Sequence, residues 1–474
     1  MQNNYDCVII GGGAGGLLSA SLLAKQGMKV ALLEKNKHCG GMIQPFVRKG
    51  VMLDTGMHFF GAGEAGQIQS ELFKTFDLQP SLSQIESGFT FLLNGQKYQI
   101  PAAGFDLFQK KMTDYFPKEK KAIEKYTETV KHITQSVKIS SLTENTGIKE
   151  EMERGAYDFI RSITKNTELQ NVLSYLSLLY AGNESSTSLY LHALITGTFI
   201  QSAFRFTNGA APFIKELETK IKQAGGQIFT QKEVQSFMYE DNRISACTCT
   251  DSSQFYAKNV ISSIHPGVLS DLLDESRIKS SYKRRIQKIQ NTPGAFLVYL
   301  LMKKETTPHL PAPLILAGDS PRDTLLIHTP KIGNKNSCTD YVKLMYIPDY
   351  KTFIPWKNTR TGTRGKAYEE CKKQLAEKLL QRTEVYLPNI RKNIREIYTA
   401  SPLTFRDYTA SPEGSAYGMV HNYQNFIANT VPVQTKIPNL FLTGQSINFH
   451  GLTGVSISAL LTCSAVLQAK RSTS

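Results

Sequence analysis

Three glycines near the start of the chain are spaced as in loops that hold phosphate groups. The pattern Gly11-x-Gly13-x-x-Gly16, completed by Ala14 and Gly15, follows directly after an apolar run. The first glycine permits a tight turn, the second lets a pyrophosphate approach the backbone, and the third lets a helix pack closely on a strand. The helix that follows would offer free N–H groups to phosphate oxygens. The pattern therefore predicts a dinucleotide site.

An acidic residue strengthens this prediction. Glu34 stands 18 residues after Gly16, at the end of the second apolar run. A carboxylate at that place can accept hydrogen bonds from the hydroxyl groups of a ribose. A glycine-rich turn without a nucleotide would have no need of it.

Hydrophobic periodicity predicts the strands and helices that carry these residues. The first unit comprises a strand over 7–10, a helix over 15–26 and a strand over 29–33. A second α/β piece comprises a helix over 213–224, a strand over 227–230 and strand pairs ending at 260–261. An apolar run at 439–442 and a helix from about 453 to 469 close the chain. These pieces predict an α/β fold whose Rossmann-like nucleotide-binding domain is discontinuous, over residues 1–75, 205–270 and 435–474.

The remaining stretches, 76–204 and 271–434, have a different pattern of predicted strands and helices. Asn94-Gly95 between the apolar runs 89–93 and 96–100 predicts a hairpin, because Asn-Gly suits the turn that strand twist favours. Further strands are expected at 296–302 and 341–347, and helices over most of 104–200 and over 364–380. We therefore expect a second, substrate-binding domain of antiparallel sheet with helices.

The segment after Glu34 resembles the flavin amine oxidase and phytoene desaturase superfamily. Lys35 is followed by the pair Gly40-Gly41 and by a Gly-x-x-x-Asp-x-Gly segment that ends at Gly56. In that family the equivalent segments line FAD, so the resemblance implies FAD as the cofactor. The family usually has Arg after the glycine pair, whereas Met42 stands here, so that one contact is not carried over.

The C-terminal segment NLFLTGQSINFHGLTGVSISALLT resembles the closing motif of the same family. The resemblance implies that Gly444, Gln445, Gly454 and Val455 contact FAD, with the start of the last helix near the flavin ring. Gln445 replaces the Asp that the family commonly has, and it can still form a hydrogen bond but adds no charge. Val234 matches the position where the family contacts adenine through a backbone amide.

Within the superfamily, the segment SPLTFRDYTASPEGSAYGMVHN looks like the carotenoid isomerase and retinol saturase group. The resemblance implies saturation, desaturation or isomerisation of a C=C bond in a hydrophobic polyene or related lipid. Such chemistry needs an external electron donor or acceptor when it changes the hydrogen count, and it can need a group that moves a proton. Tyr417, His450, Arg406 and Asp407 are candidates. Each has a structural alternative: core packing for Tyr417, a ribityl or backbone partner for His450, and an ion pair for Arg406 with Asp407.

Two other functions stay open. A flavin amine oxidase would carry aromatic residues on both sides of the flavin, and Tyr417 has no clear partner in the sequence. A non-catalytic escort that binds lipids, as the GDP-dissociation inhibitors of the same fold do, would not need the full set of glycines with Glu34.

Charge and cysteine content restrict the partners and the compartment. The chain carries 55 Lys and Arg against 40 Asp and Glu, a net charge of +15. The basic stretches QKKM and SYKRRIQKIQ match no nucleic-acid motif and suit an anionic membrane surface or a solvated helix face. Seven scattered cysteines without metal-ligand spacing indicate reduced thiols and no metal. No run of apolar residues long enough to cross a membrane and no secretory signal is evident, so we expect a cytoplasmic protein, peripheral on the membrane.

Overall fold

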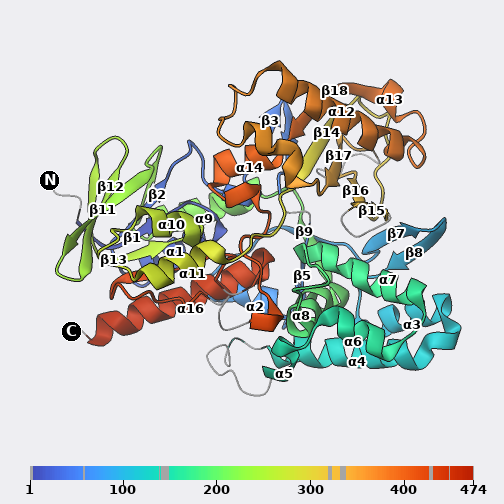
Figure 1. Ribbon diagram of the computed structural model, residues 1–474, viewed down its shortest axis with the longest axis horizontal. Helices are drawn as coiled ribbons and strands as arrows, with labels where there is room; N and C mark the ends of the chain where they lie inside the picture. The colour runs from blue at the N-terminus through green and yellow to red at the C-terminus, as the bar shows by residue number, and fades with distance from the viewer. Residues whose placement is uncertain are drawn as a thin grey trace.

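The computed structural model describes residues 4–56, 59–137, 139, 149–318, 323–330, 338–425, 431–447 and 449–472. Two seven-stranded sheets form its frame, one on the left and one at the upper right of Figure 1. The first sheet has the strand order β10 (Gln227–Thr230), β2 (Val30–Glu34), β1 (Asn4–Ile10), β13 (Gln254–Ser262), β12 (Arg243–Cys249) and β11 (Val234–Glu240). Strand β19 (Leu440–Leu442) pairs with β13. Strands β10, β2, β1, β13 and β19 are parallel, and β11 and β12 are antiparallel.

Both faces of this first sheet are covered, as its fully buried central strands require. On one face, Cys7 and Ile9 of β1 pack into a core shared with α1 (Ala14–Lys25), α9 (Ala211–Gln223), α2 (Ile68–Thr75) and α16 (Gly451–Ser472). On the other face, Val8 and Ile10 pack into a core shared with α10 (Pro266–Leu272) and α11 (Ser280–Lys288). The sheet and its helices therefore bring the two ends of the chain and its middle together.

The second sheet has the order β18 (Ile394–Ala400), β14 (Phe296–Met302), β17 (Tyr341–Tyr346), β16 (Leu325–His328), β15 (Leu314–Leu316), β7 (Phe89–Leu93) and β8 (Gln96–Ile100). All of its pairs are antiparallel except β15 with β7. Positive φ angles at Asn94 (51°) and Gly95 (78°) make the tight turn between β7 and β8. Helix α12 (Gly365–Glu384) packs its buried residues on one face of this sheet.

A layer of helices lies at the lower right of Figure 1 and packs into one core with the β7–β8 hairpin. It contains α3 (Phe105–Tyr115), α4 (Lys120–Ser136), α5 (Lys149–Glu153), α6 (Ala156–Ile163), α7 (Thr167–Tyr175) and α8 (Leu189–Gln201). Two small sheets join β3 (Phe46–Arg48) with β4 (Val51–Leu53), and β5 (Phe60–Gly61) with β9 (Ala203–Phe206) and β6 (Leu82–Gln84). Helices α13 (Ile390–Asn393) and α14 (Pro402–Thr409) follow α12. Short 3₁₀ helices span Gly41–Ile43, Pro117–Glu119, Leu176–Tyr180, Tyr350–Trp356, Pro412–Gly414 and Tyr423–Asn425.

The expected elements are confirmed, most of them to within two residues. The hairpin strands 89–93 and 96–100 and the strand 296–302 have the predicted bounds, and the closing helix begins at Gly451 rather than near Thr453. The mixed α/β class of the fold is likewise confirmed. The limits of the two domains stay a prediction, although the first sheet does take its strands from three separate parts of the sequence.

The sequence analysis expects no segment long enough to cross a membrane, but by length and composition helix α16 passes that test, as the one such helix in the described part of the chain. Its stretch Gly451–Lys470 has a mean hydropathy of 1.6, and 50% of it is buried inside the protein. Residues such as Ala459, Cys463 and Val466 are fully buried in the core that α16 shares with α1. Packing against α1 accounts for the apolar character of that face.

Candidate active site

One cavity of about 430 Å³ runs along the carboxyl edge of the first sheet and continues toward the second. Nearly all of the site residues predicted from the sequence line it. They are Gly11, Gly13, Ala14, Gly15, Glu34, Lys35, Gly40, Gly41, Gly56, Val234, Tyr417, Gly444, Gln445, His450, Gly454 and Val455. Gly16 and the candidates Arg406 and Asp407 are the predicted residues that are not among the lining residues. The fold thus brings together segments that are more than 400 residues apart in the sequence.

The glycine loop separates a packing role from a binding role. A Cβ on Gly16 would lie 2.0 Å from the carbonyl oxygen of Gly11, so this glycine is required where the helix crosses the strand. A Cβ on Gly13 would meet no protein atom within 4 Å, because Gly13 borders the cavity. Gly13 is also the N-cap of α1, and no side chain caps that helix. The first N–H groups of α1 are therefore available to an anion in the cavity.

Glu34 lies at the end of β2 and is 5% exposed. Its Oε2 accepts a hydrogen bond from Gly12 N at 2.7 Å, and its Oε1 accepts one from Asn36 N at 2.7 Å. Burial raises the pKa of this carboxyl group, and the two backbone donors oppose the shift. Each oxygen keeps a further lone pair for a donor in the cavity.

Three glycine segments meet beside the loop. Gly40 N donates to Gly12 O at 2.8 Å, and a Cβ on Gly41 would lie 3.2 Å from Gly13 Cα. A Cβ on Gly15 would lie 3.2 Å from Gly444 Cα. Gly444 has a φ of 106°, which favours glycine, and its N–H donates to Ser458 Oγ at 3.0 Å. The closing motif is thus held against the opening loop by backbone contacts that leave no room for side chains.

The start of α16 forms another wall of the cavity. Gly451, Thr453, Gly454 and Val455 line it. A Cβ on Gly454 would lie 2.1 Å from the carbonyl oxygen of Phe449, so the chain can only turn into the helix here because residue 454 is glycine. The N-terminal end of a long helix, with its partial positive charge, consequently borders the cavity.

The two ends of the cavity differ in chemistry. Its charged Lys, Arg, Asp and Glu lining residues are Glu34, Lys35, Lys232 and Glu233, which gather at the ends of β2 and β10. The other end is lined by apolar side chains that lie mainly on the second sheet and in the helical layer: Phe59, Phe89, Leu178, Leu179, Leu194, Ile195, Phe199, Leu297, Ile315, Leu326, Met345 and Ile347. In the described part of the chain, no group of three His, Cys, Asp or Glu side chains is arranged to hold a metal ion.

Tyr417 and His450 lie together at the cavity, with His421 behind them. The ring centroids of Tyr417 and His450 are 5.6 Å apart, and those of His421 and His450 are 4.9 Å apart. Tyr417 Oη donates to the carbonyl oxygen of Leu179 at 2.9 Å. Burial raises the pKa of Tyr417 to about 12, lowers that of His421 to about 4 and lowers that of His450 well below its usual value. All three side chains are therefore neutral at physiological pH.

The sequence alone did not suggest His421, since only the fold brings it against His450. Lys343 was missed in the same way. This lysine on β17 is 1% exposed, and its Nζ donates to the backbone oxygens of Asp54 (3.2 Å) and Thr55 (3.3 Å). Thr55 lines the cavity, so a buried ammonium group holds the segment that leads to Gly56. Burial lowers the pKa of Lys343 to about 8.

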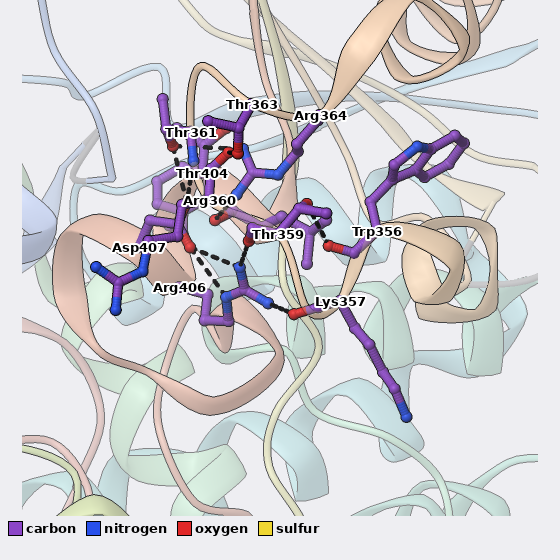
Figure 2. A network of polar contacts seen from close by, with 12 residues as sticks. Trp356, Lys357, Thr359, Arg360, Thr361, Thr363, Arg364, Thr404, Arg406 and Asp407 are labelled. Atoms are coloured by element: carbon purple, nitrogen blue, oxygen red, sulfur yellow. Dashed lines mark hydrogen bonds and ion pairs between the residues drawn. The ribbon is translucent and has the colours of Figure 1, made fainter.

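Arg406 and Asp407 form an ion pair, which was the structural alternative to a catalytic role. Neither residue lines the cavity. Asp407 forms ion pairs with Arg406 and with the buried Arg364 (Figure 2). Burial by itself would raise the pKa of Asp407, but hydrogen bonds from Arg406 and Thr361 lower it below its usual value. A carboxylate held in this way is unsuited to exchanging protons with a substrate.

Comparisons with known proteins agree with this arrangement. The family described as flavin containing amine oxidoreductases matches residues 14–467. The chain is 26% identical to the all-trans-retinol 13,14-reductase of Rattus norvegicus over 99% of this chain and 86% of that protein. It is 22% identical to the chloroplastic prolycopene isomerase of Daucus carota over 97% of this chain and 79% of that protein.

Among solved structures, an oxidoreductase from Methanosarcina mazei superposes with a TM-score of 0.68 at 17% identity. The superposition covers 97% of this chain and 99% of the other, so the two share a fold along their whole length. The family match begins within the glycine loop, at Ala14, and includes the substrate-side segments and nearly all of α16. This chain therefore belongs to the flavin containing amine oxidoreductases, and its cofactor is a flavin.

Proposed function

We propose that this protein is an FAD-dependent oxidoreductase that acts on a C=C bond of a hydrophobic polyene or a related lipid. The observation that carries the proposal is a cavity that joins a glycine-lined, partly charged end to an apolar end. A dinucleotide fits the first end and a long hydrophobic molecule fits the second.

The residues at the charged end fit FAD. The space beside Gly13 and the uncapped start of α1 suit a pyrophosphate, because they offer N–H groups without an intervening side chain. Glu34 would hold the ribose hydroxyls, and Val234, which lines the cavity at the start of β11, would meet the adenine. Gly444, Gln445, Gly454 and Val455 would border the flavin ring. A bound flavin supplies a group that accepts or donates hydride.

The apolar end fits the substrate class named by the relatives. Its lining residues Phe59, Phe89 and Phe199 pack on one another, with centroids 4.6 to 5.5 Å apart, and give an extended apolar wall. Among the three possible reactions we favour saturation, since four relatives named as all-trans-retinol 13,14-reductases are 24% to 26% identical, against 22% for the named isomerase. Saturation also requires an external electron donor.

We propose Tyr417 as the proton donor, because its hydroxyl keeps its proton at physiological pH, and His450, whose neutral ring can accept a proton, as the group that would take one up in the reverse direction. Adding hydrogen across a C=C bond takes a hydride and a proton, and the proton must come from an acid beside the substrate. His450 Nδ1 is buried without a hydrogen-bond partner, and Tyr417 Oη is tied to Leu179 O. The neutral state of both groups suits an apolar substrate, because a buried charge beside it would be costly.

The test uses the purified protein and a polyene-producing host. Flavin bands in the visible spectrum, release of FAD on denaturation and a gain of 2 mass units in the extracted polyene would support the proposal. Unchanged mass with altered absorption would indicate isomerisation, and a loss of 2 would indicate desaturation. A protein that holds no flavin, even after FAD is added, would refute the proposal.

An amine oxidase is the second candidate, and the family includes such enzymes by name. The apolar end of the cavity has no carboxylate among its lining residues to hold an ammonium group, which places this candidate lower. Hydrogen peroxide release on amines, without turnover of polyenes, would reverse the order. A lipid-binding escort without catalysis would leave the glycines beside Gly13 without a use.

We also propose that the enzyme works in the cytoplasm at a membrane surface. On α3, Leu107 is 38% exposed and is followed one turn later by Lys110 and Lys111. On α11, Arg284 and Lys288 are exposed. Apolar and basic side chains together suit an anionic lipid surface. Flotation with anionic vesicles, and not with neutral ones, is the expected result.

A further inference from the structure

Asp407 is the centre of a buried polar network outside the cavity (Figure 2). Its carboxylate accepts five hydrogen bonds, two from Arg406, two from Thr361 and one from Arg364. The side chain of Arg364 is 3% exposed and that of Asp407 is 15% exposed. Arg406 also donates to the backbone oxygens of Lys357 and Thr359. The network therefore fixes α14 to the segment before α12.

The last turn of α14 is also bound by two residues that follow β2. Lys35 Nζ donates to the carbonyl oxygen of Asp407 at 2.7 Å, and Asn36 Nδ2 donates to that of Tyr408 at 2.8 Å. These carbonyl groups belong to the end of a helix, where no N–H of the helix itself can reach them. Two consecutive residues that follow Glu34 thus cap α14, although they lie about 370 positions away in the sequence.

The capped turn is part of the cofactor end of the cavity. Residues 408–411 line the cavity, as do Lys35 and Asn36, which are hydrogen-bonded to α14. Asn36 also donates its backbone N–H to Glu34 Oε1 at 2.7 Å. The same residue therefore connects the carboxylate that would hold the ribose with the helix that faces it.

We propose that α14 is a latch over the adenosine end of the cofactor site, and that Asp407, Arg364 and Asn36 are positioning residues that slow the release of FAD. The proposal rests on the proposed function, in which FAD is the cofactor. Asp407 and Arg364 hold the helix to the segment before α12, and Asn36 holds its last turn beside the end of β2. Opening the adenosine end requires that the bonds from Lys35 and Asn36 break, and breaking them in advance shortens the lifetime of bound FAD.

The decisive variant is Asn36→Ala. It removes the hydrogen bond to Tyr408 O and leaves the backbone bond from residue 36 to Glu34 in place. The loss of one hydrogen bond is expected to speed the release of FAD about fivefold. Asp407→Asn should speed it more, since it also leaves the buried Arg364 without its counter-ion. Glu377→Gln, which breaks an exposed ion pair with Arg391 on the outside of α12, is the matched control.

Release is measured on the holoprotein as the rise of free FAD fluorescence after dilution into a volume of buffer large enough to prevent rebinding. Hydrogen exchange of residues 405–411 gives a second readout that needs no turnover, and it should be faster in Asn36→Ala and unchanged in Glu377→Gln. Unchanged release and exchange in Asn36→Ala would overturn the latch, even if Asp407→Asn fails to fold. A wild-type protein that binds no FAD would instead refute the proposed function.

Discussion

Lys343 gives a quantitative test of the interior of the second sheet. Its ammonium group is buried against two backbone oxygens, and the pKa of about 8 lies about 2.5 units below the usual value of 10.5. The unfolded chain therefore binds this proton more tightly than the folded one. Below pH 8 both states are protonated and the folded state bears the full cost of the buried charge. Between pH 8 and 10.5 the cost disappears, so the stability contribution rises with pH.

The size of the effect follows from the two pKa values. Between pH 7 and pH 9 the contribution of Lys343 rises by about 1.3 kcal/mol. For a chain of 474 residues the entropy of unfolding is about 1 kcal/mol per kelvin, so the expected change in Tm is about 1 °C. Measurement should stop at pH 9, because buried tyrosines such as Tyr299 have raised pKa values and reverse the trend at higher pH.

Scanning calorimetry of wild type and Lys343→Met at pH 7 and pH 9 gives the answer. The difference in Tm between wild type and variant should shift by about 1 °C in favour of wild type at pH 9. Lys373→Met, at an exposed position of α12, should show no such shift. If the difference for Lys343→Met is the same at both pH values, the lysine has an ordinary pKa and the reasoning from burial is wrong.

Three further predictions concern the cavity. Gly16→Ala places a methyl group 2.0 Å from Gly11 O, so it should lower Tm or abolish soluble expression. Gly13→Ala should change the free energy of unfolding of the apoprotein by less than about 1 kcal/mol and should weaken FAD binding strongly. Thermal unfolding and a flavin titration would separate the two effects. Glu34→Gln replaces the carboxylate that accepts a hydrogen bond from Gly12 N by an amide, which accepts more weakly or donates instead. The Kd for FAD should rise about 10- to 100-fold in the same titration. An unchanged Kd would show that Glu34 does not contact FAD. The pKa of His421 is about 4 in the folded protein, so its burial as a neutral ring costs no stability above pH 6.5. Between pH 6.5 and 5 the unfolded chain binds the proton and the folded one does not, so the free energy of unfolding should fall by about 1.5 kcal/mol. Urea titrations at the two pH values should show a smaller loss for His421→Gln.

The cofactor half of the site could be predicted because its signals are local. The glycine loop, Glu34 and the glycine pair Gly40-Gly41 stand within one unit of strand, helix and strand, and the helix and strand periods are legible on both sides of them. The hairpin at Asn94-Gly95 was predictable for the same reason, since both residues have the positive φ angles that the turn needs. Where a backbone angle requires a particular residue type, that requirement can be recognised from the residue at that position alone.

The network around Asp407 could not be predicted, because its parts depend on contacts between distant segments. Arg406 and Asp407 are neighbours in the sequence, and an ion pair was one reading of them. Nothing in the sequence shows that Arg364 reaches the same carboxylate, or that Lys35 caps the helix that carries it. Such contacts have no fixed spacing, so a periodic pattern cannot reveal them.

The apolar end of the cavity shows a different limit. Phe59, Phe89, Leu179, Phe199 and Leu326 are ordinary core residues by type, and each would be expected in the interior of a folded protein. What distinguishes them is that they line a space that they leave unfilled between the helical layer and the second sheet. An unfilled volume belongs to the packing of several elements and not to any one residue. A glycine can be read in the sequence as a position without a side chain, whereas the wall of a cavity cannot be read from residue types. The cofactor could therefore be inferred from the sequence, but the residues that border the space for a substrate became known only from the fold.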